Sequence, residues 1–244
     1  MSTAKSRPLR LLCFGDAAGE VWGGAVSAGT AALAFGTPDG TGSAIGSGEL
    51  SVRHDDDGWL LSGQDFELRF SPVGEDGAAE PSAAGDELCH VEGRLSVAGN
   101  ERAVSCPGTV SVEPETRIGG LDSVRALSGW FGDDHGLTVR ALRPAGSDGH
   151  EQDALAATLF DPEEWVAVTD PRLSTTFRPS ELPARASLEL WVGDGEELYP
   201  RRAAAEAAGQ AAEAGGDGLR LAITPLHCHS AGHDGTGVYL IAHL

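Results

Sequence analysis

The sequence predicts an all-β protein, built as two antiparallel barrels or sandwiches that pack together. Short apolar runs with a period of two recur between clusters of Gly, Asp and Pro, which is the pattern of antiparallel strands with one buried face. The 244 residues give each half enough chain for about eight strands, the number that closes a barrel around one small ligand. The apolar pattern lapses at residues 114–121, so we predict two β domains at residues 1–121 and 122–244.

A β-hairpin at residues 50–61 is the clearest local prediction. Leu50–His54 and Trp59–Leu61 flank Asp55–Gly58, whose Asp-Gly pair supplies the positive φ angles of a tight turn. Apolar and polar residues then alternate over Asp65–Phe70, which predicts a strand with one buried face and one wet face.

The same pattern predicts the remaining strands. They are expected at Leu88–Val97, Val104–Val112, Ala126–Phe131, Leu137–Leu142, Ala154–Phe160, Trp165–Thr169, Ser187–Val192, Leu219–Leu226 and Val238–Leu244. Residues 74–86, rich in Gly, Ala, Glu and Pro, are predicted to form a surface loop. Helix and strand stay equally open for Ala203–Ala214, because an alanine-rich run with Glu favours helix but its apolar surface consists only of methyl groups.

The net charge of −20 excludes two classes of partner. The 37 acidic residues against 17 basic ones repel a phosphate backbone and an anionic membrane surface, so nucleic acid is not an expected partner. No run approaches the ~20 apolar residues that span a bilayer, and no long apolar stretch follows the basic N-terminus as in an export signal. We therefore predict a cytoplasmic protein with no membrane insertion, and leave its oligomeric state open.

The four cysteines show no Cys-x-x-Cys spacing. In a cytosolic chain, such scattered cysteines are interpreted as buried small hydrophobic residues. They are Cys13, Cys89, Cys106 and Cys228. A disulfide between Cys89 and Cys106 is the alternative.

Five short phrases in the second half resemble a known family. They are Ser128–Phe131, Arg140–Pro144 with His150 six residues on, Asp170–Thr176, Leu188–Trp191 and Tyr199–Arg202. Together they resemble the hydroxyneurosporene-synthase-like, or carotenoid-hydratase-like, proteins over roughly residues 124–202. The resemblance implies two lipocalin-like β domains, and proteins that hold polyenes, terpenoids or other hydrophobic molecules and hydrate or cyclise them.

Glu189 is a candidate catalytic acid. In Ser187–Val192, strand parity places Glu189 and Trp191 on one face and the leucines with Val192 on the other. Buried against the Trp191 ring inside a barrel, the Glu189 carboxyl group would have a raised pKa and could protonate an alkene or epoxide. The alternative is that Glu189 lies on the wet face and Trp191 is a half-exposed packing residue.

Arg143 and His150 are the second catalytic hypothesis. Pro144 ends a strand, and the glycines after it turn the chain towards His150, so the two side chains could meet at a barrel mouth. Arg143 could then hold a carboxylate or an enolate, and His150 could exchange a proton near neutral pH. The alternative is a surface arginine paired with a neighbouring aspartate, and a solvated histidine.

One or two of the five tryptophans are expected to line a pocket for a hydrophobic guest. Trp130 and Trp191 are preferred because they lie in the resembling phrases, and Trp22 is a further candidate for substrate binding; most of the five, which also include Trp59 and Trp165, are expected in the core. No metal site is predicted, because His227-Cys228-His229 on a strand more often faces water than a metal ion.

We expect an enzyme that needs no cofactor: a cyclase, isomerase or hydratase that folds a polyene, terpenoid or polyketide into a reactive shape in a β-barrel pocket. The partner is then a hydrophobic small molecule. One alternative is a lipocalin-like carrier that binds such a molecule without changing it. Another is a structural or interaction protein whose barrels are filled by side chains.

Overall fold

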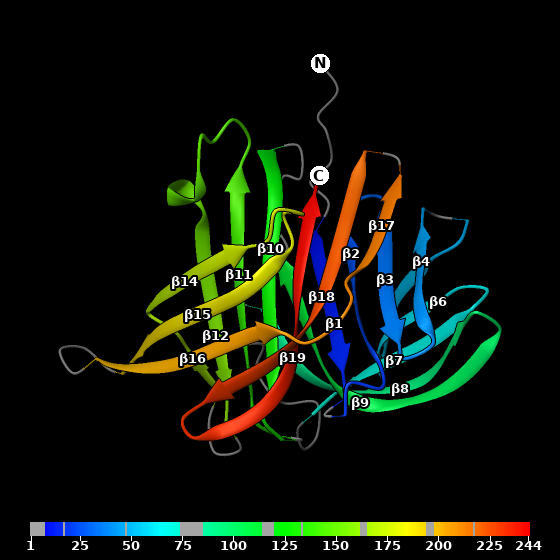
Figure 1. The fold of residues 1–244 in the computed structure, drawn as a ribbon, viewed down its shortest axis with the longest axis horizontal. Coiled ribbons are helices and arrows are strands. Elements are labelled where there is room, and N and C mark those ends of the chain that lie inside the picture. Colours follow the sequence, from blue (N-terminus) through cyan, green and yellow to red (C-terminus); the bar gives the residue numbers. More distant parts are fainter. Residues whose placement is uncertain are drawn as a thin grey trace.

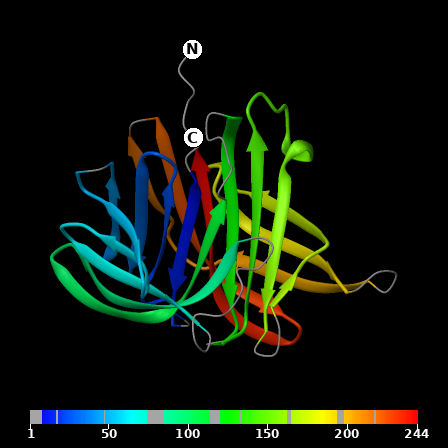
Figure 2. The same ribbon diagram turned by 180° about the vertical axis from the view of Figure 1, so that it is seen from behind.

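The computed structural model describes residues 8–16, 18–46, 48–73, 85–113, 120–132, 134–161, 165–193, 198–216 and 218–244, without the side chains of Trp165 and Ala167. Two antiparallel sheets contain nearly all of its regular structure, which confirms the all-β prediction (Figure 1). Each sheet curls into a barrel-like half, and Figure 2 shows the two halves from behind.

The first sheet contains the nine strands β1–β9. Their bounds are β1 (Leu9–Gly15), β2 (Trp22–Ser27), β3 (Ala31–Thr37), β4 (Gly40–Ile45), β5 (Ser51–Asp55), β6 (Gly58–Ser62), β7 (Phe66–Pro72), β8 (Asp86–Val97) and β9 (Asn100–Glu113). They are ordered β4-β3-β2-β1-β9-β8-β7-β6-β5, so β1 pairs with both β2 and β9. The chain forms an up-and-down meander whose two edges are β4 and β5.

The second sheet repeats this order. Its strands are β10 (Leu121–Trp130), β11 (Gly136–Pro144), β12 (Ala154–Phe160), β13 (Trp165–Ala167), β14 (Asp170–Phe177), β15 (Pro183–Val192), β16 (Tyr199–Ala207), β17 (Ala212–Gly216), β18 (Leu219–Ser230) and β19 (His233–His243). They are ordered β13-β12-β11-β10-β19-β18-β16-β15-β14, with β17 pairing β18 outside this path. The first strand, β10, again pairs with the second and the last, so both halves share one topology.

Each sheet encloses its own core, and a third core lies between the sheets. The first core, inside the first sheet, includes Phe14, Leu68 and Phe70. The second core, inside the second sheet, includes Leu127 and Leu188. The intersheet core is built from one face of β1–β3 and of β10 and β17–β19, and β17 and β18 pack across β2–β4 (Figure 1).

A buried polar cluster also joins the two sheets. Asp86, at the start of β8, forms an ion pair with Arg140 on β11, and the Asp86 side chain is completely buried. Its Oδ2 accepts hydrogen bonds at 2.8 Å from the hydroxyls of Thr138 and Thr158. Arg140 Nε also donates to Glu113 Oε1 of the first sheet at 2.6 Å. The polar groups that apolar packing would otherwise leave unpaired therefore have partners across the interface.

The predicted hairpin at residues 50–61 is confirmed. β5 and β6 pair antiparallel, with Asp55 opposite Gly58. Gly58 has a φ of +116°, and a Cβ atom there would lie 2.2 Å from the carbonyl oxygen of Phe70, so the position requires glycine. On β7, Phe66, Leu68 and Phe70 are buried as the alternation predicted.

Four other expectations have different outcomes. The open segment Ala203–Ala214 forms the end of β16 and the start of β17, joined by residues 208–211, and contains no helix. Most of the predicted surface loop 74–86, namely residues 74–84, lies outside the described residues. Its last residue, Asp86, is the first residue of β8. All four cysteines are free and buried, as the first interpretation predicted, and the Cys89–Cys106 disulfide is absent. The sheets change between β9 and β10, while the division into two domains at residue 121 stays a prediction.

Among the residues that the structure describes, no helix has the length and hydropathy of a membrane span.

Candidate functional site

A cluster of charged side chains lies at one end of the second core. Arg125 on β10 has the same strand parity as Leu127, and Arg143 on β11 has the same parity as Val139, so both arginines lie on the side of the sheet that faces this core. Between them is Asp153, directly before β12. Asp153 Oδ2 lies 2.5 Å from Arg125 Nη2, and Oδ1 lies 3.0 Å from Arg143 Nε.

His150 completes this cluster, which we call the Asp153 cluster. Its Nδ1 lies 3.3 Å from Asp153 Oδ2 and contacts Arg143 Nη2. Its ring stacks on Phe177 of β14, with ring centroids 6.0 Å apart and planes 13° apart. The His150 side chain is 52% exposed, whereas that of Asp153 is 1% exposed. An accessible imidazole is thus held by a buried carboxylate.

The turn between β11 and β12 explains how these residues meet. Pro144 ends β11 as predicted, and Gly146, with a φ of +77°, donates its backbone N–H to Asp122. A short 3-10 helix over His150–Gln152 then brings the chain back, and the N–H of Asp153 donates to the carbonyl of His150. The structure therefore brings Arg143 and His150 together through this turn. The sequence reasoning missed Asp153 and Arg125.

Opposing effects act on the pKa of the Asp153 carboxyl group. Burial alone would raise it, but hydrogen bonds from Arg143, Arg125 and His150 lower it below the ordinary value. Asp153 is therefore ionised at neutral pH. Because two guanidinium groups face this single carboxylate, the Asp153 cluster carries a net positive charge in a chain whose net charge is −20.

A second polar contact crosses the core of the same half. The hydroxyl of Tyr239, on β19, lies 2.9 Å from the hydroxyl of Thr175, on the edge strand β14. Burial raises the pKa of Tyr239, so its hydroxyl stays protonated and can donate. This contact and the His150–Phe177 stack together hold β14 over the open side of the sheet.

Glu189 and Trp191 do not lie inside the second half. Their neighbours on β15, Leu188 and Leu190, belong to the second core, so the alternation of side chains turns Glu189 and Trp191 outwards. Hydrogen bonds from Arg202, with Nη2 3.0 Å from Oε1, lower the pKa of Glu189, and Arg172 lies 5.8 Å above the Trp191 ring. The hypothesis of a buried, protonated Glu189 is therefore wrong, because two arginines stabilise its ionised form on the outer face.

The other predicted tryptophans have different positions. Trp130 is 2% exposed and belongs to the intersheet core. Trp22 lies in the same core and also lines a cavity of about 420 Å³ between the sheets, together with Asp16, Gln210 and His227. Trp165 is in β13, and its side chain is outside the described residues.

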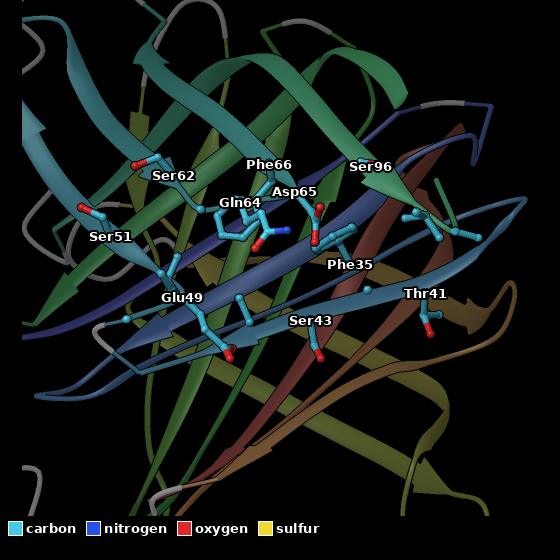
Figure 3. A pocket seen from close by; sticks show the side chains of 17 residues that line it. Phe35, Thr41, Ser43, Glu49, Ser51, Ser62, Gln64, Asp65, Phe66 and Ser96 are labelled. Carbon is cyan, nitrogen blue, oxygen red and sulfur yellow. The ribbon is translucent and has the colours of Figure 1, made fainter. Parts of the chain in front are cut away.

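Two further cavities lie at the ends of the halves. One of about 330 Å³ lies at the end of β11 opposite Arg143 and is lined mainly by apolar residues, including Phe131, Leu137, Leu159 and Val192. The other, of about 550 Å³, opens in the first half and is shown in Figure 3. Both volumes fall within the range of small-molecule sites.

The C-terminal histidines do not gather into a metal-binding cluster. His227 and His229 lie on the exposed face of β18, and His229 Nδ1 is 2.8 Å from Asp234 Oδ1. Within the described ranges, no group of three or more His, Cys, Asp or Glu side chains could hold a metal ion.

Comparisons with known proteins show which solved structures have a similar fold. No protein-family model and no curated protein matches the sequence. Among solved structures, kievitone hydratase from Nectria haematococca is similar at 10% identity, covering 98% of this chain and 89% of that one, with a TM-score of 0.62. CghA is similar at 12% identity, covering 97% and 88%, with a TM-score of 0.61. A putative AttH from Nitrosomonas europaea has 13% identity, covering 98% and 93%, with a TM-score of 0.60.

These three structures share the fold of this chain. The similarity covers almost the whole of each chain. At such low sequence identity, it shows only that the backbone folds are alike. The two-half, lipocalin-like β fold that the resemblance implies is therefore confirmed.

Proposed function

We propose that this protein is an enzyme that moves a proton on a hydrophobic substrate, without a cofactor, at the Asp153 cluster. The observation that carries the proposal is the exposed His150 imidazole held by the buried carboxylate of Asp153, with the Arg143 guanidinium beside it. A base that is oriented by a third group is the usual arrangement of an activated proton-transfer site. The reaction is an isomerisation, a cyclisation or a hydration.

Each side chain has a distinct role in this proposal. When Nδ1–H of His150 donates to Asp153 Oδ2, Nε2 carries the free lone pair and is the nitrogen that exchanges the proton with the substrate. Arg143 stabilises negative charge that develops on a substrate oxygen. Asp153 and Arg125 are positioning residues, because they hold His150 and Arg143 and are themselves almost fully buried.

The charge of the cluster favours an oxyanion over a carbocation. Two guanidinium groups and one carboxylate repel a developing cation but stabilise an enolate. The substrate would therefore have a carbonyl group conjugated with the reacting bond. His150 removes a proton from carbon to give the enolate, and returns it to another carbon in an isomerisation. In a hydration, His150 takes a proton from the water that adds to the β-carbon of the conjugated alkene, and returns this proton to the α-carbon of the resulting enolate.

The apolar surroundings support a hydrophobic substrate. Phe177 stacks on His150, and the side chains of Leu127, Val139 and Ile241 form the neighbouring core. Kievitone hydratase, by its name a hydratase, has the same fold. A conjugated polyene, terpenoid or polyketide ketone combines the apolar body and the carbonyl group that this site would bind.

Deuterium labelling tests the proposal without knowledge of the natural substrate. The purified protein is incubated in D₂O with a panel of conjugated enones and polyenones, and products are analysed by high-resolution mass spectrometry. We expect protein-dependent deuterium uptake, and a loss of about 10²–10⁴-fold in its rate for His150→Gln.

His90→Gln is the matched control, because the His90 side chain is 49% exposed on the first sheet and lies outside the cluster. Equal labelling by His150→Gln and His90→Gln would overturn the proposed role of His150. If no panel compound is labelled by the unmodified protein, the enzyme proposal fails for this substrate class.

A carrier function is the second candidate. The mainly apolar cavity of about 330 Å³ beside Phe131 and Leu137 favours it, because this cavity could hold a hydrophobic guest without contact with His150. Native mass spectrometry followed by denaturing extraction distinguishes the two functions. A carrier releases its ligand unaltered, whereas an enzyme that is given the right precursor yields a changed molecule.

A further inference from the structure

The cavity of about 550 Å³ in the first half is separate from the Asp153 cluster (Figure 3). Its walls come from both edge strands of the first sheet, β4 and β5, and from the connections β4–β5, β6–β7 and β8–β9. These connections meet at one end of the half, so the cavity opens where the curled sheet is not closed by strand pairing.

The floor of this cavity is aromatic. Phe35 and Phe66 have ring centroids 6.1 Å apart, and Leu50 and Val97 lie with them in the lining. Two glycines in the wall let the rings occupy these positions. A Cβ atom on Gly42 would lie 2.5 Å from the Phe35 ring, and one on Gly63 would lie 2.5 Å from the Phe66 ring.

The rim of the cavity is polar and acidic. Glu49 and Asp65 are the charged members of the described lining, and the uncharged polar ones are Thr41, Ser43, Ser51, Ser62, Gln64 and Ser96. Figure 3 shows Phe35 and Phe66 at the centre of the view, with Gln64, Asp65, Glu49 and Ser43 around them.

Neither rim carboxylate forms an ion pair within the described part of the chain. Glu49 accepts only a backbone hydrogen bond of 3.2 Å from Ile45 there. Some other exposed carboxylates of the same half do have arginine partners: Asp55 lies 2.7 Å from Arg69, and Glu101 lies 3.0 Å from Arg94. Two carboxylates without a cationic partner among the described residues, above an apolar floor, are complementary to a molecule that has both a positive charge and an apolar group.

We propose that this cavity binds a small organic cation, namely a protonated amine attached to a flat apolar group. The apolar group would pack in the cavity above Phe35 and Phe66, and the ammonium group would pair with a rim carboxylate, Asp65 or Glu49. The surrounding hydroxyl groups accept its remaining hydrogen bonds. The net charge of −20 attracts such a cation and repels an anion of the same shape.

Three probes of nearly equal shape test the proposal. They are 1-naphthylmethylamine, which is a cation at neutral pH, neutral 1-naphthalenemethanol and anionic 1-naphthoate. Binding to the full chain is measured by isothermal titration calorimetry at low salt. We expect the amine to bind at least about tenfold more tightly than the alcohol, the naphthoate to bind more weakly than both, and the amine's advantage to shrink as salt is raised.

Charge-neutral variants locate the binding. Asp65→Asn and Glu49→Gln should each weaken amine binding by about tenfold and leave binding of the alcohol nearly unchanged. Glu67→Gln is the matched control, since Glu67 is an exposed acid two residues from Asp65 that does not line the cavity.

Two results would overturn the proposal. The first is naphthoate binding as tightly as the amine. The second is an equal effect of Glu67→Gln and Asp65→Asn on amine binding, because the loss would then reflect the charge of the whole chain. Both results are independent of the activity proposed for the Asp153 cluster.

Discussion

Asp86 of the first sheet and Arg140 of the second form an ion pair whose side chains are 0% and 3% exposed. The pair lies where β8 meets β11, and two threonines from the second sheet also donate to Asp86. The packing of the two sheets therefore depends on charged side chains as well as on the intersheet core.

Removing one partner of this pair should destabilise the whole protein. Asp86→Ala removes the fully buried carboxylate from the Arg140 guanidinium and leaves it with the partly exposed Glu113, which costs about 3 kcal/mol. The double variant Asp86→Leu with Arg140→Met should be more stable than Asp86→Ala, because it removes both charges together. Urea unfolding at neutral pH measures both differences. A double variant less stable than Asp86→Ala would show that the pair is not the main cause of the loss.

Asp153→Asn should have an effect that depends on pH. The pKa of Asp153 is lowered in the folded protein, so its carboxylate contributes stability above the ordinary value of 3.8, and that contribution is lost as pH falls through the lowered pKa. We expect a loss of about 3 kcal/mol at neutral pH, which shrinks below pH 3.8. Urea unfolding across this range checks it. Glu206→Gln, in an exposed pair with Arg185, should change stability by less than about 0.5 kcal/mol at every pH.

Gly36→Ala should disturb the intersheet cavity. A Cβ atom on Gly36 would lie 2.0 Å from the Trp22 ring, so the ring must move, at a cost of about 1–3 kcal/mol. Gly120→Ala is the control, because a Cβ atom there has no neighbour within 4 Å. Thermal unfolding and tryptophan fluorescence would show a shift for Gly36→Ala alone. Unchanged stability of this variant would mean that Trp22 is not tightly packed.

All four cysteines should resist alkylation in the folded protein. Burial raises the pKa of Cys13, Cys106 and Cys228 to about 12, and it also raises that of Cys89. Since the thiolate is the reactive form, iodoacetamide at pH 8 should leave the native mass unchanged and add four groups after unfolding in urea. Rapid labelling of the native protein at any one cysteine would show that its surroundings open to solvent.

Strand parity predicted much of the fold because the period of two records directly which residues share a face. It placed Phe66, Leu68 and Phe70 on one buried face of β7. Propensity failed for Ala203–Ala214, because cross-strand pairing decides its conformation: Ala203 pairs with Ser230, and Ala205 with Cys228, on the wall of the second core.

The Asp153 cluster was only half predictable. Arg143 and His150 lie close in sequence, so the proline and glycines between them indicated a turn that joins them. Arg125 lies on a neighbouring strand, and Asp153 is one of 37 acidic residues, so nothing local distinguished either. For Glu189, parity showed which residues share its face. The larger aliphatic content of the other face, with Leu188 and Leu190, was the signal that Glu189 points outwards.

The central position of β19 in the second sheet has a consequence for folding during synthesis. Every strand pair of the first sheet is available once Glu113 has been made, whereas Ser123 of β10 must wait for His243. At about 5–20 residues per second, the ribosome therefore exposes a first half that can already close while β10 still lacks β19, the second of its two neighbours. In that interval the open edge of β10 and the uncovered apolar face of β1–β3 are the surfaces that a chaperone would need to shield.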